Sequence, residues 1–96
     1  MTLEEIRLEM DATDDRLVAL LAERGRLVRA AWVLKQADGV DRLDVTREAA
    51  VLFRLRERGA SLGLDPADVE RIWREILRVR AASLRRNSQT AWSNPC

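Results

Sequence analysis

Residues 3 to 37 read LEEIRLEMDATDDRLVALLAERGRLVRAAWVLKQA, and this stretch decides the fold. It contains no proline, and its one glycine is Gly25. Apolar side chains recur in it every three or four residues, at Leu3, Ile6, Met10, Leu17, Leu20, Leu27, Ala31 and Leu34. This spacing predicts a single helix of roughly 35 residues with one apolar stripe.

A helix of that length needs a partner. At 1.5 Å per residue it would be about 52 Å long, whereas a compact monomer of this size has a diameter of only about 32 Å. The rest of the chain is therefore too small to cover the whole stripe. We expect a second copy, related by a two-fold axis, to cover what remains.

Two cations lie on the same apolar stripe. Arg24 occupies one of its positions, and Lys35 follows eleven residues later, within about 20° of Arg24 around the helix. Lys35 is also the only lysine in the chain. Because a buried charge is costly unless something pairs with it, two cations directed at a helical core indicate a bound anion.

The composition fits one helical domain. The chain has 96 residues, of which 47% are hydrophobic and 34% charged, and it has only four glycines and two prolines, too few for a turn-rich β-fold. The net charge of +1 argues against nucleic-acid or membrane binding. One cysteine, Cys96, excludes an internal disulfide, and the charged start of the chain does not resemble a signal peptide. We expect a cytoplasmic protein.

Two further helices complete an all-α fold of three helices per chain. Asp44 is predicted to cap a helix that runs to about Ser61, with Gly63 just beyond its end. Asp65 and Pro66 then have the pattern of a helix start, as N-cap and first helical residue. We expect a helical domain over residues 1–84 and a flexible polar tail over residues 85–96.

Charged residues of the later helices can join the two cations. Arg47 and Glu48 stand with Asp44 at the start of the second helix, and Arg80 lies on the apolar stripe of the third. Arg7 lies about 100° from Arg24 around the first helix, so it could enter only the site of a dimer partner. Several cations with one carboxylate would suit a small dianion that also carries a hydroxyl or an amine.

Each of these residues also has an ordinary structural interpretation. Arg24 could extend from the apolar stripe to water or pair with an acidic side chain, and Lys35 could complement the helix dipole. Arg47 and Glu48 could form a solvated pair, and Arg80 could be one more surface arginine. Their coincidence, rather than any one of them, favours a site.

The pattern resembles the all-helical (AroQ-class) chorismate mutases from Leu3 to about Ser83. The similarity rests on the run Leu-x-x-Leu-Leu-x-x-Arg from Leu17 to Arg24, on Lys35, on Asp44-x-x-Arg47-Glu48, and on Gly63-Leu64-Asp65-Pro66. It implies an intertwined homodimeric helical bundle. Arg7 would enter from the other chain and hold the substrate's carboxylates with Arg24, and Arg47 would add to the cationic wall.

The same resemblance implies the chemistry. Lys35 would donate to the ether oxygen of the breaking C–O bond, Glu48 would accept from the ring hydroxyl, and the Asp44 backbone would assist. Lys35, Glu48 and Arg24 would be the catalytic residues. The family's reaction is the [3,3]-sigmatropic (Claisen) rearrangement of chorismate to prephenate, a step of the shikimate pathway, and it uses no cofactor, metal or covalent step.

Two positions depart from the family. Its third helix offers a serine to a carboxylate and, four residues later, a glutamine or glutamate to the ether oxygen. Arg80 and Leu84 stand at those positions here. Leucine cannot donate a hydrogen bond, and Arg80, one turn away, is expected to compensate.

Three enzymatic interpretations remain open from the sequence. The chain could be a modest chorismate mutase whose activity a partner enzyme raises. It could instead act on 4-amino-4-deoxychorismate in an antibiotic pathway, or be an isochorismate-pyruvate lyase. The alternative outside catalysis is a helical dimerisation module or a DNA-associated bundle, against which sixteen acids balance seventeen bases.

Overall fold

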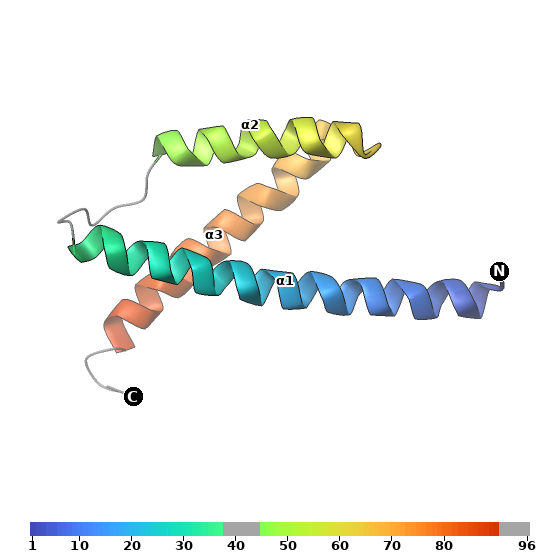
Figure 1. Cartoon of the computed structure of the whole chain (residues 1–96), viewed down its shortest axis with the longest axis horizontal. Coiled ribbons are helices and arrows are strands. Elements are labelled where there is room, and N and C mark those ends of the chain that lie inside the picture. The colour runs from blue at the N-terminus through green and yellow to red at the C-terminus, as the bar shows by residue number, and fades with distance from the viewer. Residues whose placement is uncertain (38–44, 91–96) are drawn as a thin grey trace. The chain divides into compact units, whose positions relative to one another are not determined.

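The structure is a computed structural model, which describes the chain at residues 1–37 and 45–90 and the side chains of residues 1–35 and 46–83. Three helices make up the described part, with no strand in it, so the all-α prediction is confirmed (Figure 1). The chain divides into two compact units, Met1–Asp41 and Arg42–Cys96, and each is described in turn.

The first unit is the helix α1, Leu3–Ala37, with the bounds that the sequence predicted. Its start is fixed by the side chains of Thr2 and Glu5. Glu5 N donates to Thr2 Oγ1 at 3.1 Å, and Thr2 Oγ1 donates to a carboxylate oxygen of Glu5 at 3.0 Å. A backbone donor that the first turn would otherwise leave unpaired is thus satisfied by the N-cap side chain.

Most of the apolar side chains of α1 are exposed. On the apolar stripe, Leu17 is 55% exposed and Leu27 is 65% exposed. The other exposed side chains of the stripe include Leu3, Ile6, Met10, Leu20 and Leu34. No helix of the described residues has the length and apolar run needed to cross a lipid bilayer.

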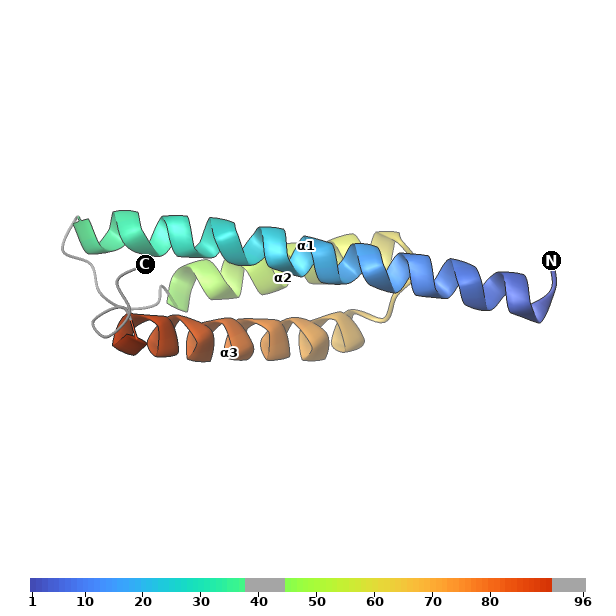
Figure 2. The ribbon, with the colours of Figure 1, turned by 90° about the horizontal axis from the view of Figure 1, so that it is seen from below.

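The second unit is a helical hairpin. It consists of α2, Val45–Ser61, and α3, Pro66–Thr90, which run in opposite directions from the turn between them. Figure 1 shows the two helices diverging from that turn, and Figure 2 shows the same pair from below. The buried apolar side chains that the structure describes are all in this unit: Val51, Leu52 and Val69.

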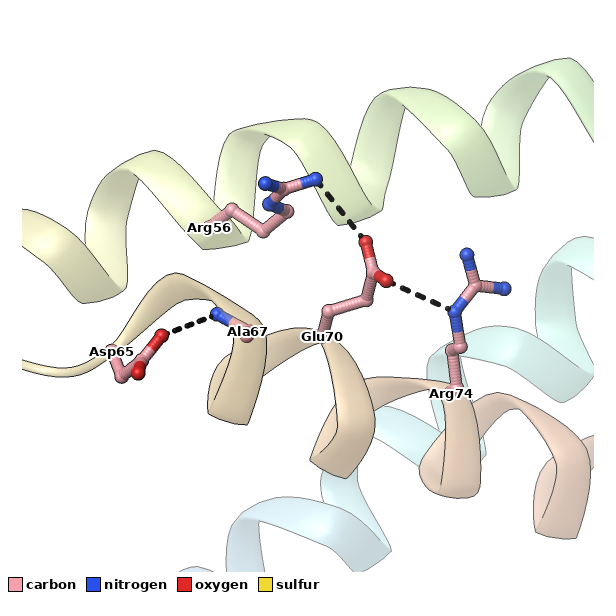
Figure 3. Close-up of polar contacts among 5 residues, drawn as sticks. All are labelled: Arg56, Asp65, Ala67, Glu70 and Arg74. Carbon is pink, nitrogen blue, oxygen red and sulfur yellow. Dashed lines mark hydrogen bonds and ion pairs between the residues drawn. The ribbon is translucent and has the colours of Figure 1, made fainter.

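The turn combines two capping motifs. Leu64 N donates to Gly59 O at 2.8 Å and Gly63 N donates to Ala60 O at 3.1 Å, which is the Schellman pattern. Gly63 has φ +85°, a conformation that glycine adopts without steric cost. Asp65 Oδ1 then accepts from Ala67 N at 2.8 Å and caps α3 (Figure 3). Both predicted signals, at Gly63 and Asp65, are confirmed.

One sequence-based expectation falls outside the described residues, and another differs from the structure. The predicted N-cap Asp44 lies outside the described residues. The polar tail was expected from Arg85, but the backbone of α3 stays helical to Thr90. The added segment, Arg85 to Thr90, contains neither proline nor glycine, and polarity alone does not end a helix.

The backbone of the turn gives a first prediction. Gly63→Ala should lower the free energy of unfolding by about 1 kcal/mol, because an alanine at positive φ is strained. No atom lies within 4 Å of a Cβ at this position, so the cost comes from the backbone alone. Urea denaturation would measure it.

Gly63→Asn is the matched control, since asparagine tolerates the left-handed region better than alanine does. It should cost clearly less than Gly63→Ala. Equal losses in the two variants would contradict the proposed cause.

Candidate functional site

The charged side chains that are shielded from solvent identify the candidate site. Among the described side chains, the charged ones that are only half-exposed are Arg24, Lys35, Glu48, Glu70 and Arg80. Four of these five are residues that the sequence assigned to the site. Since shielding a charge from water costs free energy, the agreement between these positions and the sequence-based assignment supports a functional role.

The first unit supplies three of the predicted residues. Arg24 and Lys35 share one face of α1 to within about 20° and stand about 16 Å apart along its axis. Arg7 is exposed and lies on α1 about 25 Å from Arg24 along the axis, on another face. Within one helix, Arg7 and Arg24 therefore do not converge.

The second unit supplies three more, at the end of the hairpin away from its turn. Arg47 and Glu48 are in the first turn of α2, where Arg47 is exposed and Glu48 half-buried. Arg80 is half-buried on α3. Asp44 lies outside the described residues, and Leu84 lies on α3 with its side chain outside the described ones.

Arg80 differs from the other arginines of α3 in its surroundings. Arg71 pairs with Asp68, Arg74 with Glu70 and Arg78 with Glu75. The hydrogen bond from Arg78 holds the pKa of Glu75 below its ordinary value. No carboxylate of the described residues lies within ion-pair distance of Arg80. Among the arginines of α3 whose side chains the structure describes, Arg80 is thus the one best placed to meet an external anion.

The seam between α2 and α3 sets the direction in which Glu48 and Arg80 point. At the turn end Gly59 lies against Val69, with a hypothetical Cβ on Gly59 only 2.5 Å from Val69 Cγ2. In an antiparallel pair, residues at equal distances from such a contact lie at the same level. Glu48 and Arg80 are each eleven residues away from it, and therefore on the same helix faces to within about 20°.

Apolar residues occupy the corresponding positions of both helices between these two pairs. The positions follow a four-three-four spacing on both helices: 59, 55, 52 and 48 on α2, and 69, 73, 76 and 80 on α3. Leu52 is buried, while Leu55, Trp73 and Ile76 are half-buried. Glu48 and Arg80 thus lie beyond these apolar positions, at the diverging end of the hairpin (Figure 1), and this charged level could bind a ligand with both a negative group and a donor.

A carboxylate that the sequence reasoning missed joins the two helices near the turn. Glu70 accepts from Arg56 of α2 at 3.3 Å and lies 3.4 Å from Arg74 Nε of α3 (Figure 3). The four-residue spacing of Glu70 and Arg74 was a usable sequence signal for half of this cluster. The contact with Arg56 spans fourteen residues and has no such local signal.

The described residues offer no evident metal site. No group of three or more His, Cys, Asp or Glu among them is arranged to hold a metal ion. What the arrangement offers instead is fixed charge, supplied by arginine, lysine and one half-buried glutamate.

Comparison with known proteins gives one match. Residues 6–82 match the model of the family described as chorismate mutase type II. No curated protein matches the chain, and no solved structure matches it.

Proposed function

The chain belongs to the chorismate mutase type II family, and from that premise we propose that it converts chorismate to prephenate through its own half-buried charges. Family membership makes it an isomerase of the chorismate mutase type. The observation that supports the residue assignment is that Arg24, Lys35, Glu48 and Arg80 are half-buried while most other charged side chains are exposed.

The reaction needs positioning and electrostatics rather than a reactive group. In the rearrangement a C–O bond breaks while a C–C bond forms, and negative charge grows on the ether oxygen. Lys35 is proposed to donate to that oxygen, and Arg24 to hold a carboxylate in the folded conformer. Such fixed donors lower the barrier because they are already oriented before the charge develops.

Glu48 and Arg80 are proposed to bind opposite features of the substrate. Glu48 accepts from the ring hydroxyl, and Arg80 donates to a carboxylate or to the ether oxygen. Arg80 thereby takes over the donor role that Leu84 cannot fill. Asp44 and Arg47, at the start of α2, are proposed to complete the binding site through a backbone group and a further cation, respectively.

A second candidate substrate follows from the same residues. In 4-amino-4-deoxychorismate the ring hydroxyl is replaced by an amine. Glu48 would then face an ammonium group, so that both partners of the hydrogen bond carry charge instead of the acceptor alone. Leu84 lacks the hydrogen-bond donor that the family has at this position, and this difference favours testing 4-amino-4-deoxychorismate as a substrate. The third candidate, isochorismate-pyruvate lyase activity, is separated from both by its products.

We also propose a homodimer in which Arg7 of the partner subunit completes the site. The charge of α1 changes sign along its length. From residue 3 to residue 23 it has seven acidic and two basic side chains, and from 24 to 37 four basic and no acidic ones. Two copies that pair antiparallel through α1 therefore place opposite charges together.

The same pairing explains the distance between Arg7 and Arg24. A two-fold axis that crosses α1 near residues 18–19 would bring Arg7 of the partner subunit level with the midpoint between Arg24 and Lys35. The exposed apolar side chains of α1, such as Leu17 and Leu20, would then be covered by the second copy. An activating partner enzyme remains part of the proposal for a modest mutase.

The function is tested by incubating the purified protein with chorismate, 4-amino-4-deoxychorismate or isochorismate and identifying products by mass. Arg24→Ala should lower kcat/KM on the true substrate by about 10²–10³-fold, as the loss of one oriented donor does elsewhere. Its melting temperature should stay near that of the wild type. Arg26→Ala is the matched control, since Arg26 is exposed, and should keep full activity. Equal kinetics in the two variants would contradict the assignment of Arg24.

Mixing two inactive variants tests the dimer. Arg7→Ala and Arg24→Ala chains, denatured together and refolded, should recover roughly a quarter of the wild-type activity, because half of the dimers would be mixed and have one intact site. If Arg7 acted in the site of its own chain, every site would keep one defect. The mixture would then stay as inactive as its components.

Arg80→Ala should lower kcat/KM by on the order of 10²-fold, because no other donor of α3 is expected to reach the ether oxygen. Arg78→Ala is the control on the next face of the same helix. Leu84→Gln, which restores the family's donor, should raise turnover of chorismate. Unchanged kinetics in Arg80→Ala would remove this residue from the site.

A further inference from the structure

Gly59 of α2 lies in close contact with Val69 of α3. A Cβ placed on Gly59 would be 2.5 Å from Cγ2 of Val69 and 3.5 Å from its Cβ. Carbon atoms in ordinary contact are about 3.5–4.0 Å apart. A side chain at residue 59 would therefore require Val69 or the helices to shift at this point. Gly59 and Val69 are both buried, and Val69 is only 8% exposed.

The contact is held in place from two sides. On one side, the Schellman turn at Gly63 and the Asp65 cap fix the path of the chain from α2 into α3. On the other, Glu70 next to Val69 is shared between Arg56 and Arg74 (Figure 3). The helices can therefore neither slide nor separate easily at this end.

Beyond this contact the helices diverge (Figure 1). Glu48 and Arg80 lie about 16 Å along their helices from it, on the faces that Gly59 and Val69 define. Because helices are stiff over three turns, the spacing at the contact is transmitted to the distance between these two charged residues. The glycine sets that spacing, since any larger residue would alter it.

We propose that the Gly59–Val69 contact is the pivot that sets the separation of Glu48 and Arg80, which makes Gly59 and Val69 positioning residues for the reaction. The kinetic part of this inference rests on the function proposed above. The geometric part concerns the α2–α3 hairpin alone. Neither residue needs to touch the substrate.

The direct test is a distance. Spin labels at Thr46→Cys and Val79→Cys, both exposed positions near the charged level, would report the opening of the hairpin in a Cys96→Ser background. Diluting the labelled chain with unlabelled chain restricts the measurement to one chain. Gly59→Ala should shift the mean distance by about 1 Å or more, since a carbon 2.5 Å from another must move out to ordinary contact.

Two further variants keep the test decisive if Gly59→Ala folds poorly. Val69→Ala removes the methyl groups that meet Gly59 and should shift the distance in the opposite direction. The double variant Gly59→Ala/Val69→Ala relieves the clash and should return the distance toward the wild-type value. This rescue separates a change of spacing from a general loss of stability.

The kinetic arm uses the same variants without labels. Gly59→Ala should lower kcat/KM by at least about tenfold, since a displacement near 1 Å can cost 10²-fold, and the double variant should recover most of the loss. Ala60→Gly is the matched control. Ala60 is exposed and adjacent to the pivot, so this change weakens α2 by about 1 kcal/mol without altering the contact and should keep wild-type kcat/KM.

Each outcome has a definite meaning. An unchanged label distance in folded Gly59→Ala would overturn the pivot. A shifted distance with unchanged kcat/KM would overturn the positioning role. If the wild type turned over none of the three substrates, the proposed function and the kinetic claim would fall together, and the label distance would still decide the geometric claim.

Discussion

The free-energy cost of removing a charged side chain from water is the constraint on which this structure depends. A chain that is one-third charged can place nearly all of its charges on the surface, and this one does so for most. Glu70 is half-buried, and two arginines compensate it. Arg24, Lys35, Glu48 and Arg80 share its degree of shielding, which suits side chains proposed to bind a dianion with a donor group.

The local signals of the sequence were sufficient for most of the fold. Thr2 and Glu5, Gly63, and Asp65 with Pro66 act within a few residues of themselves, so their roles follow from spacing alone. The end of α3 was missed because the segment after Ser83 has no residue that stops a helix. A change to polar composition is by itself a weak signal for the end of a helix.

The charged residues proposed for the site could be picked out from the sequence, whereas the contact at Gly59 could not. Arg24, Lys35 and Glu48 carry charge at positions of an apolar period, and this contradiction is visible in the sequence. A glycine at position 59, by contrast, does not conflict with the pattern around it. A glycine near the end of a helix has several ordinary explanations, and only the position of Val69 shows that a side chain there would collide with α3. Contacts between residues distant in sequence are what periodicity cannot supply.

The charged residues of the proposed site and the residues that set the helix spacing are linked by the kind of reaction proposed. A rearrangement that uses no covalent intermediate depends on where fixed charges stand when the ether oxygen becomes negative. Electrostatic stabilisation falls with distance, and an oriented donor is effective only within hydrogen-bond range of the developing charge. The spacing of two helices is then as much a determinant of rate as the identity of the donor. On a hairpin that is tight at one end and open at the other, that spacing is fixed where α2 and α3 touch. Under the proposed function, the absence of one Cβ at Gly59 would thus contribute to catalysis together with the charges at Glu48 and Arg80.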